Sequence, residues 1–185
     1  GVQWATANSA IGSSAQSVDN GASNTAAIIA AFPSDNSSNN AAWSCHNYSD
    51  PTEGHADWYL PSKNELNKMY IYANANNLIG TGCTGSKDGG VQCLLGGYST
   101  TYKYYWSSTE YCGGNDGAWV QEFSGGGQYY YYKIGYYFGA RAARAFNDST
   151  NLTIYQFTKS GYENIDISFA AIDFTNNFDC CGTSL

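Results

Sequence analysis

Charged residues are scarce in this chain. Only 12% of its 185 residues are Asp, Glu, Lys or Arg, and 8 Lys and Arg stand against 15 Asp and Glu, which gives a net charge of -7. Binding to nucleic acid or to sulfated polymers depends on Lys and Arg side chains that neutralise the anionic backbone. The composition therefore argues against nucleic acid as a partner.

Long apolar runs are also lacking. No stretch approaches the roughly 20 apolar residues that a helix needs to cross a bilayer, so we expect no membrane insertion. No signal peptide is visible either. Because the sequence begins with Gly1 rather than Met, we expect a fragment or a processed form.

Metal ligands are few. The chain has 2 His and no Cys-x-x-Cys motif, so the ligand spacing of a zinc site is missing. His46 and His55 lie near Asp50, Glu53 and Asp57 in the sequence, but the spacing repeats no known calcium loop, and we interpret these residues as polar surface. We expect no cofactor, although a structural calcium ion is not excluded.

The 6 Cys form an even set. Cys83 and Cys93 flank a Gly-rich loop that a disulfide could close, whereas the adjacent Cys180 and Cys181 could hardly bond each other without strain. Low charge, many Asn, Ser and Thr, and paired Cys together predict an exported protein with disulfides.

Tyrosine is abundant, and it is concentrated. Of the 17 Tyr, nine lie between residues 104 and 146, and four are consecutive at 129–132. Consecutive residues of an extended chain point to opposite faces, and a buried Tyr hydroxyl needs a partner, so at least one face of such a run should be wet. Tyr together with Gly, Ser and Asn is the composition of antibody binding loops.

The pattern predicts three helices in the first half. One begins with Ser23 or Asn24 as its cap and is stopped by Pro33, and a second, short one covers 41–45. Ser62 and Glu65 have the spacing of a capping box and open a third, whose buried face is formed by Leu66, Met69, Tyr70 and Ala73. The Gly-rich residues 76–101 are expected to form a long loop.

Strand signals dominate from residue 104. We predict strands over 104–107, 118–123, 128–133 and 139–146, followed by a hairpin of 151–158 and 164–174. This divides the chain into a domain of residues 1–146 and a C-terminal β-hairpin extension of residues 147–185. Trp106 and Trp119 are expected in the core.

The predicted strand over 139–146 contains two arginines at an odd separation, so their side chains would point to opposite faces. If Arg141 and Arg144 lie in one extended segment, one of them points inward and needs a carboxylate. We expect Glu110 or Glu65 to supply it, and the hydroxyls of residues 107–109 to satisfy local backbone groups.

Several motifs occur in an order that resembles the bacterial surface-domain family found at the C-termini of collagen-like adhesins. The similarity covers about residues 1–146 and rests on Gly1-Val2-Gln3-Trp4, Asn24-Thr25-x-x-Ile28, Asp57-Trp58-Tyr59-Leu60-Pro61-Ser62-Lys63-x-Glu65-Leu66-x-x-Met69-Tyr70, Tyr105-Trp106-Ser107-Ser108-Thr109-Glu110, Ala118-Trp119 and Arg141-Ala142-x-Arg144-Ala145-Phe146. The resemblance implies an α+β, C-type-lectin-like fold related to formylglycine-generating enzymes, with two or three helices around short antiparallel sheets, and a possible homotrimer.

Some members of that family are variable proteins of diversity-generating retroelements, in which a reverse transcriptase miscopies adenines of AAC-rich codons. The varied segment would be about 106–146 here. Replacing the adenines of AAC yields Tyr, Asp, Gly, Ser, Ile, Val, Phe or Cys but never Trp, Glu, Gln, Lys or Met. Residues 112–117, 129–132 and 134–139 are all reachable, whereas five nearby residues are not and would be fixed scaffold: Trp119, Gln121, Glu122, Gln128 and Lys133. The family usually has a basic residue near Gly139, and its absence here departs from the pattern.

The resemblance and the composition together predict a non-enzymatic, surface-displayed recognition domain. The related enzymes need a redox Cys pair that the matching strands lack. The expected location is extracellular, on a bacterial cell surface or a phage tail tip, and the expected partner is a protein or glycan on another cell. The alternative is a structural trimeric adhesin head whose aromatics form subunit interfaces. The predicted ligand-binding positions are Tyr111, Gly113, Gly114, Asn115, Asp116, Val120, Ser124, Tyr129, Tyr130, Tyr131, Tyr132, Ile134, Tyr136, Tyr137, Phe138 and Gly139.

Overall fold

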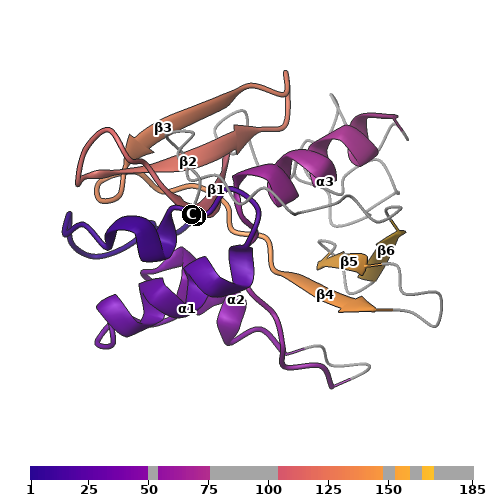
Figure 1. Ribbon diagram of the computed structural model, residues 1–185, viewed down its shortest axis with the longest axis horizontal. Helices are drawn as coiled ribbons and strands as arrows, with labels where there is room; N and C mark the ends of the chain where they lie inside the picture. Colours follow the sequence, from indigo (N-terminus) through magenta and orange to yellow (C-terminus); the bar gives the residue numbers. More distant parts are fainter. Residues whose placement is uncertain (50–53, 76–103, 148–152, 159–163, 169–185) are drawn as a thin grey trace.

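The computed structural model describes residues 1–49, 54–75, 104–147, 153–158 and 164–168 (Figure 1). In chain order its elements are the 3-10 helix η1 (Gly12–Ala15), helices α1 (Gly21–Ala31), α2 (Ala41–His46) and α3 (Lys63–Ala75), and strands β1 (Tyr104–Glu110), β2 (Gly117–Glu122), β3 (Gln128–Tyr132), β4 (Ala143–Asn147), β5 (Thr153–Thr158) and β6 (Asn164–Ser168). The described part of the chain is therefore an α+β structure, as predicted.

Two antiparallel sheets form from these strands. The first has the order β1-β2-β3, and the second has the order β4-β5-β6. The predicted C-terminal hairpin is confirmed as the β5-β6 pair. β5 also pairs with β4, so the hairpin continues a sheet that starts at Ala143, and the predicted strand over 139–146 is shorter and begins later than expected. The predicted turn at 159–161 lies outside the described residues.

Two strands of the first sheet, β1 and β2, are covered on both faces. Its register pairs Trp106 with Val120 and Tyr105 with Gln121, so neighbouring residues of β1 point to opposite sides. Trp106 and Val120 belong to the core cluster that includes Ile28 of α1. Tyr105 packs edge-on against Phe123 on the side of α3. α1 and α2 therefore lie below the sheet in Figure 1, and α3 lies beside its other face.

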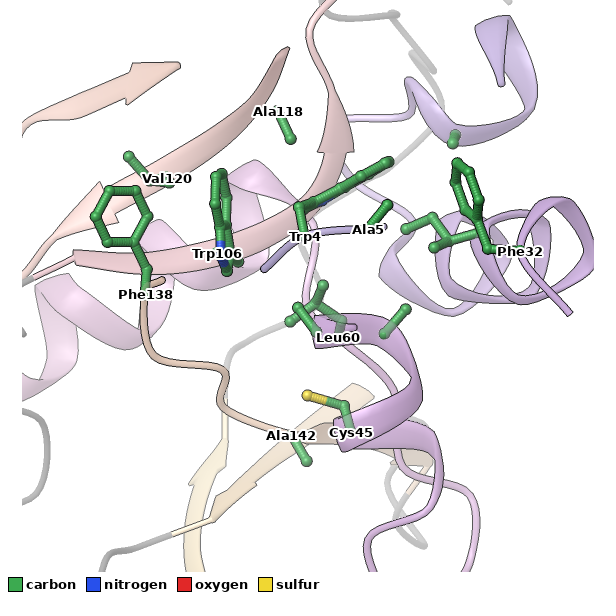
Figure 2. Packing of buried hydrophobic residues seen from close by; sticks show 14 of the residues in the cluster. Trp4, Ala5, Phe32, Cys45, Leu60, Trp106, Ala118, Val120, Phe138 and Ala142 are labelled. Atoms are coloured by element: carbon green, nitrogen blue, oxygen red, sulfur yellow. The ribbon is translucent and has the colours of Figure 1, made fainter. Parts of the chain in front are cut away.

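Two indoles occupy the centre of the core. Trp4 and Trp106 are fully buried and lie side by side, with Phe138 and Val120 on one side and Phe32 on the other (Figure 2). The Nε1–H group of Trp4 donates to the Ser107 carbonyl at 2.8 Å, and that of Trp106 donates to the Val2 carbonyl at 2.9 Å. Each buried indole thus has a hydrogen-bond partner. The prediction that Trp106 is core is confirmed.

The helix caps are side-chain amides and hydroxyls. α1 begins earlier than predicted, because the side chain of Asn20 accepts the Ser23 amide and caps the helix. Asn24 is instead buried and binds the backbone of Ser17. The capping box of α3 is confirmed: the Ser62 amide donates to Glu65 Oε2 at 2.7 Å, and the Glu65 amide donates to Ser62 Oγ at 3.4 Å.

The cysteines do not all pair. Cys112 is in a disulfide, but Cys45 of α2 is a free thiol inside the core, where burial raises its pKa. The inference from an even count to complete pairing is therefore wrong at Cys45, because a buried Cys also serves as a small apolar side chain. The other four cysteines lie outside the described residues, and so does the loop that a disulfide between Cys83 and Cys93 was predicted to close.

Candidate binding surface

Among the described residues, all exposed large hydrophobic side chains except Ile71 of α3 lie on β3 and the turn after it. Tyr129, Tyr130 and Tyr132 are 46%, 54% and 55% exposed, and in the turn Tyr136 and Tyr137 are 40% and 56% exposed. We call these five residues the tyrosine surface. Ile134 lies in the same turn and is also exposed. A single exposed aromatic needs no explanation, but a contiguous group of them marks an interaction site.

The tyrosine surface wraps around both faces of β3. Tyr131 opposes Ala118 of β2 and points toward the core, where its ring lies 5.0 Å from that of Phe138. Tyr130 opposes Trp119 and points the other way, where it stacks on Tyr111 with ring centroids 4.0 Å apart and planes 3° apart. The alternation expected for consecutive Tyr is therefore present. One of the four is anchored and three are presented.

Trp119 lies beneath the Tyr130 stack. It is half-buried rather than core, which corrects the prediction. Its ring contacts Tyr111 edge-on at 5.7 Å, and Lys63 Nζ lies 3.4 Å from the ring centroid. Lys63, the first residue of α3, thus lies over a ring that stays partly exposed. Trp119 and Lys63 therefore extend the surface beyond the predicted binding positions. For Trp119 the sequence did carry a signal: consecutive residues of a strand point to opposite faces, so Trp119 and Val120 could not both face the core.

A buried ion pair supports the end of β3. Lys133 and Glu110 are 0% and 1% exposed, and the Lys133 ammonium donates to Glu110 Oε1 and, at 2.8 Å each, to the carbonyls of Ser9 and Asn115. Burial lowers the pKa of Lys133, whereas the Glu110 carboxylate acts to raise it. The three donors of the ammonium are thus satisfied. The pair ties the loop before β2 to the end of β3.

Glu110 has further ligands in the N-terminal segment. Its two carboxylate oxygens accept the amides of Ile11 and Gly12 at 2.9 and 2.7 Å. The prediction that Glu110 or Glu65 pairs with an inward arginine is wrong for Arg144, which pairs with Asp57 at 2.9 Å. Glu65 instead accepts hydrogen bonds from the amides of Gly21 and Ser62. Arg144 lies in β4, and the residue before it, Ala143, exchanges backbone hydrogen bonds with Tyr59, which places the Arg144 side chain beside Asp57.

The N-terminal segment holds the Tyr-bearing turn in place. Val2 and Phe138 exchange backbone hydrogen bonds of 2.8 and 3.1 Å. The Gly135 amide donates to Gln3 Oε1 at 2.6 Å, and the Trp4 amide donates to the Lys133 carbonyl at 3.1 Å. The turn that presents Tyr136 and Tyr137 is therefore fixed at both ends.

The structure sorts the sixteen predicted positions by exposure. Exposed positions are Gly113, Gly114, Asn115, Ser124, Tyr129, Tyr130, Tyr132, Ile134, Tyr136 and Tyr137; half-buried positions are Tyr111, Asp116, Tyr131 and Gly139; buried positions are Val120 and Phe138. Ser124 lies in the turn at the far end of the β2-β3 hairpin from the 112–116 loop. Val120 and Phe138 form part of the core and support the surface from beneath.

A pocket lies away from the tyrosine surface. An apolar pocket of about 400 Å³ is formed by α1 and residues 56–59, with His46 of α2 at its edge. None of the predicted binding positions lines it. Among the described residues, no group of three or more His, Cys, Asp or Glu side chains lies close enough together to hold a metal ion. The part of the chain that the structure describes also contains no helix long and apolar enough to cross a membrane.

Together these features define an α+β domain that presents aromatic side chains on a buried polar and aromatic support. The chain belongs to the Lcl C-terminal domain family, whose model matches residues 1–144. This is the C-terminal domain of collagen-like surface proteins, so the resemblance seen in the motifs is confirmed. Comparison with curated proteins and with solved structures gave no significant match.

Proposed function

We propose that this chain is a non-enzymatic recognition domain, displayed outside the cell on a bacterial surface or a phage tail tip, that binds a protein or glycan through the tyrosine surface. The observation that carries the proposal is the exposure of five Tyr side chains on one strand and its following turn. Tyr offers a large amphipathic contact area at low entropic cost, which makes it a frequent anchor in binding sites.

The tyrosine surface rests on buried residues that hold its backbone in place, which favours a role in binding. Tyr131 and Phe138 anchor the strand and the turn in the core, and the Lys133–Glu110 pair holds the end of the strand. A ligand would therefore lose little affinity to ordering this part of the protein. The fold that we propose for this arrangement is C-type-lectin-like.

We further propose that the surface belongs to a diversified segment of about residues 106–146. Within that segment, seven residues are of types that adenine substitution cannot reach, and all are covered: Trp106, Glu110, Gln121, Glu122 and Lys133 are buried, and Trp119 and Gln128 are half-buried. The tyrosine surface consists only of reachable residues. This division between covered scaffold and presented variable positions supports the proposal that the chain is the variable protein of a diversity-generating retroelement.

The DNA around the gene tests diversification directly. We expect a near-copy of the codons for residues 106–146 that differs only where the copy has adenine, next to a reverse-transcriptase gene. If no such repeat exists, the segment is a fixed binding surface and the retroelement proposal is wrong.

Substitution tests the binding surface itself. The variant in which Tyr129, Tyr130, Tyr132 and Tyr137 are all Ala should lose binding to ligands found on a glycan array or in a displayed peptide library, while its thermal midpoint stays near that of the wild type. Tyr131→Ala is the matched control, because its half-buried ring packs against Phe138 and its loss should lower stability instead. Unchanged binding by the fourfold variant would refute the proposal.

The alternative is a trimeric adhesin head in which the same aromatics lie between subunits. The exposure of apolar rings fits this role as well. Sedimentation at low concentration separates the two functions. A mass of three chains that the fourfold Tyr variant reduces to one would favour the structural head.

A further inference from the structure

Among the described residues, β3 is an edge strand with one open side. The first sheet has the order β1-β2-β3, so within the described residues β3 pairs with β2 alone. The other edge of that sheet is occupied, because β1 exchanges hydrogen bonds with Gly139: the Trp106 amide donates to its carbonyl at 2.9 Å, and the Gly139 amide donates to the Tyr104 carbonyl at 3.1 Å. In the part of the chain that the structure describes, the β3 edge is therefore the one available to a partner.

The register identifies which backbone groups face outward. The Lys133 amide bonds the Asp116 carbonyl at 2.7 Å, and the Glu122 amide bonds the Gly127 carbonyl at 2.8 Å. Hydrogen-bonded and non-hydrogen-bonded pairs alternate along an antiparallel ladder. Tyr129 and Tyr131 therefore bond to β2, whereas three residues direct their N–H and C=O groups away from it: Gln128, Tyr130 and Tyr132.

Natural edge strands usually carry protection that β3 lacks. Lys on the edge, Pro, or a bulge blocks pairing with another chain. β3 reads Gln-Tyr-Tyr-Tyr-Tyr, has no charge and no Pro, and pairs with β2 without the register shift that interrupts the β1-β2 pair. Its sequence has high strand propensity. Three of the exposed tyrosines, Tyr129, Tyr130 and Tyr132, therefore lie on the strand that has the open edge.

We propose that the outer edge of β3 binds an extended segment of a partner protein by strand addition. The main chain of that segment would bond to Gln128, Tyr130 and Tyr132, while the Tyr129 ring flanks one face of the added strand and the Tyr130 and Tyr132 rings flank the other. The inference rests on the proposed function and narrows it from protein or glycan to protein. Because main-chain hydrogen bonds do not depend on side-chain identity, the β3 edge could still bind a strand when the side chains around it vary.

The chemistry of the edge selects this occupant. Outward donors and acceptors recur every second residue, about 6.8 Å apart, which is the repeat of a peptide strand. A second copy of this chain is disfavoured, because each copy carries a net charge of -7. The same net charge, with the half-buried Asp116 at one end of the β2-β3 pair, favours a segment that is neutral or basic.

The test uses the full chain and short peptides selected against it from a displayed random library. Tyr130→Pro removes an outward N–H and leaves the ladder to β2 intact, since Pro is tolerated where the amide faces away from the sheet. Tyr130→Ala removes the same ring but keeps the amide, so it is the matched control. We expect Tyr130→Pro to bind the selected peptide about tenfold more weakly than Tyr130→Ala, because the Pro variant cannot donate the main-chain hydrogen bond from residue 130 to the peptide.

Hydrogen exchange on the wild-type protein gives a second readout that does not depend on a variant. The Tyr130 and Tyr132 amides should exchange quickly in the free protein and at least about tenfold more slowly in the peptide complex, whereas the Tyr129 and Tyr131 amides are slow in both. If Tyr130→Pro proves unstable to urea, this measurement decides alone.

Three outcomes would overturn strand addition: unchanged exchange at Tyr130 and Tyr132 in the complex, equal peptide affinities of a folded Tyr130→Pro and Tyr130→Ala, or a glycan array that yields ligands when the library yields none. A wild-type dimer that Tyr130→Pro dissociates would also overturn it, by making a second copy the occupant. In each case the proposed function still stands if the fourfold Tyr variant loses binding, and it falls with the inference only if that variant binds normally.

Discussion

At the scale of single residues, the support of the tyrosine surface depends on buried charge. Lys133 lies in a Tyr-rich run, directly after β3, yet it is fully buried against Glu110. A buried pair contributes little net stability relative to apolar residues, but removing one partner leaves the other charge uncompensated. Its main effect here is to specify where the 112–116 loop and the end of β3 meet.

Lys133→Met should therefore lower the free energy of unfolding by about 3–5 kcal/mol. Adding Glu110→Gln to that variant should recover part of the loss, because the uncompensated carboxylate is then gone. Lys63→Met is the control: its ammonium lies over Trp119 at a half-buried site, and the change should cost about 1 kcal/mol or less. Urea unfolding measures all three. Equal losses for Lys133→Met and Lys63→Met would contradict the role given to the pair.

Glu65 makes stability depend on pH. Burial raises its pKa above the ordinary value of 4.5, against the opposing effect of the hydrogen bonds from Ser62, Gly21 and Tyr59. A group whose folded-state pKa is raised contributes stability that is fully present below the unfolded pKa and is lost as pH rises through the folded one.

Relative to the wild type, Glu65→Gln should therefore gain stability as pH rises from about 4 to about 7. Gln keeps a carbonyl oxygen for the capping bonds but does not titrate. Urea unfolding of both proteins at several pH values checks this, and the difference between the two curves removes the contribution of other carboxylates. A difference that does not change with pH would show that Glu65 titrates normally.

At the scale of elements, the β2-β3 turn determines the register that presents the tyrosines. Gly126 has φ +80°, and a Cβ there would lie 2.4 Å from Tyr70 Cε1. At Gly125 a Cβ would contact only the Glu122 carboxyl group, at ordinary distances of 3.8 and 4.0 Å. The turn thus requires glycine at position 126 but not at position 125.

Gly126→Ala should destabilise the protein by more than about 1 kcal/mol, because Ala is strained at positive φ and its Cβ meets Tyr70. Gly125→Ala should change the free energy of unfolding by less than about 0.5 kcal/mol. Thermal unfolding of both variants tests the comparison. Similar midpoints for the two would mean that the turn tolerates side chains at both positions.

Helix and strand positions followed from local pattern at most places. The capping box at Ser62 and Glu65, the helix after Asn40, and the alternation along 118–123 are short-range signals, and the structure contains α3, α2 and β2 there. The start of α1 did not follow from local pattern, because Asn20, Ser23 and Asn24 are all residue types that cap helices well. Which of them is the cap depends on Ser17, whose backbone binds the Asn24 side chain in the interior.

At the scale of the whole molecule, the N-terminal segment closes the domain. Trp4 lies between β1 and the chain after β3: its indole bonds Ser107, and its amide bonds Lys133. Residues more than a hundred positions apart therefore meet at one fully buried ring (Figure 2).

Trp4→Ala should cost about 3–5 kcal/mol, the range for removing a buried Trp. It should also release the Tyr-bearing turn, so ligand binding should fall in the variant even under conditions where it is folded. Trp43→Ala is the matched control, because Trp43 is half-buried on α2 and bonds only the Phe32 carbonyl through its indole. Comparable loss of binding in both variants would mean that the effect is general destabilisation.

The sequence alone determined the class of fold, most helices and strands, and the concentration of Tyr on one strand, because capping, turn residues and alternation act between neighbours. It also determined the family, through motifs read in order. Only the tertiary structure decided that Lys133 rather than an arginine pairs with Glu110, that Trp119 is half-buried, and that Phe138 is core. Those outcomes depend on which segments meet across the sheet, and the free energy of burying a charge or a ring depends on the groups that surround it in space.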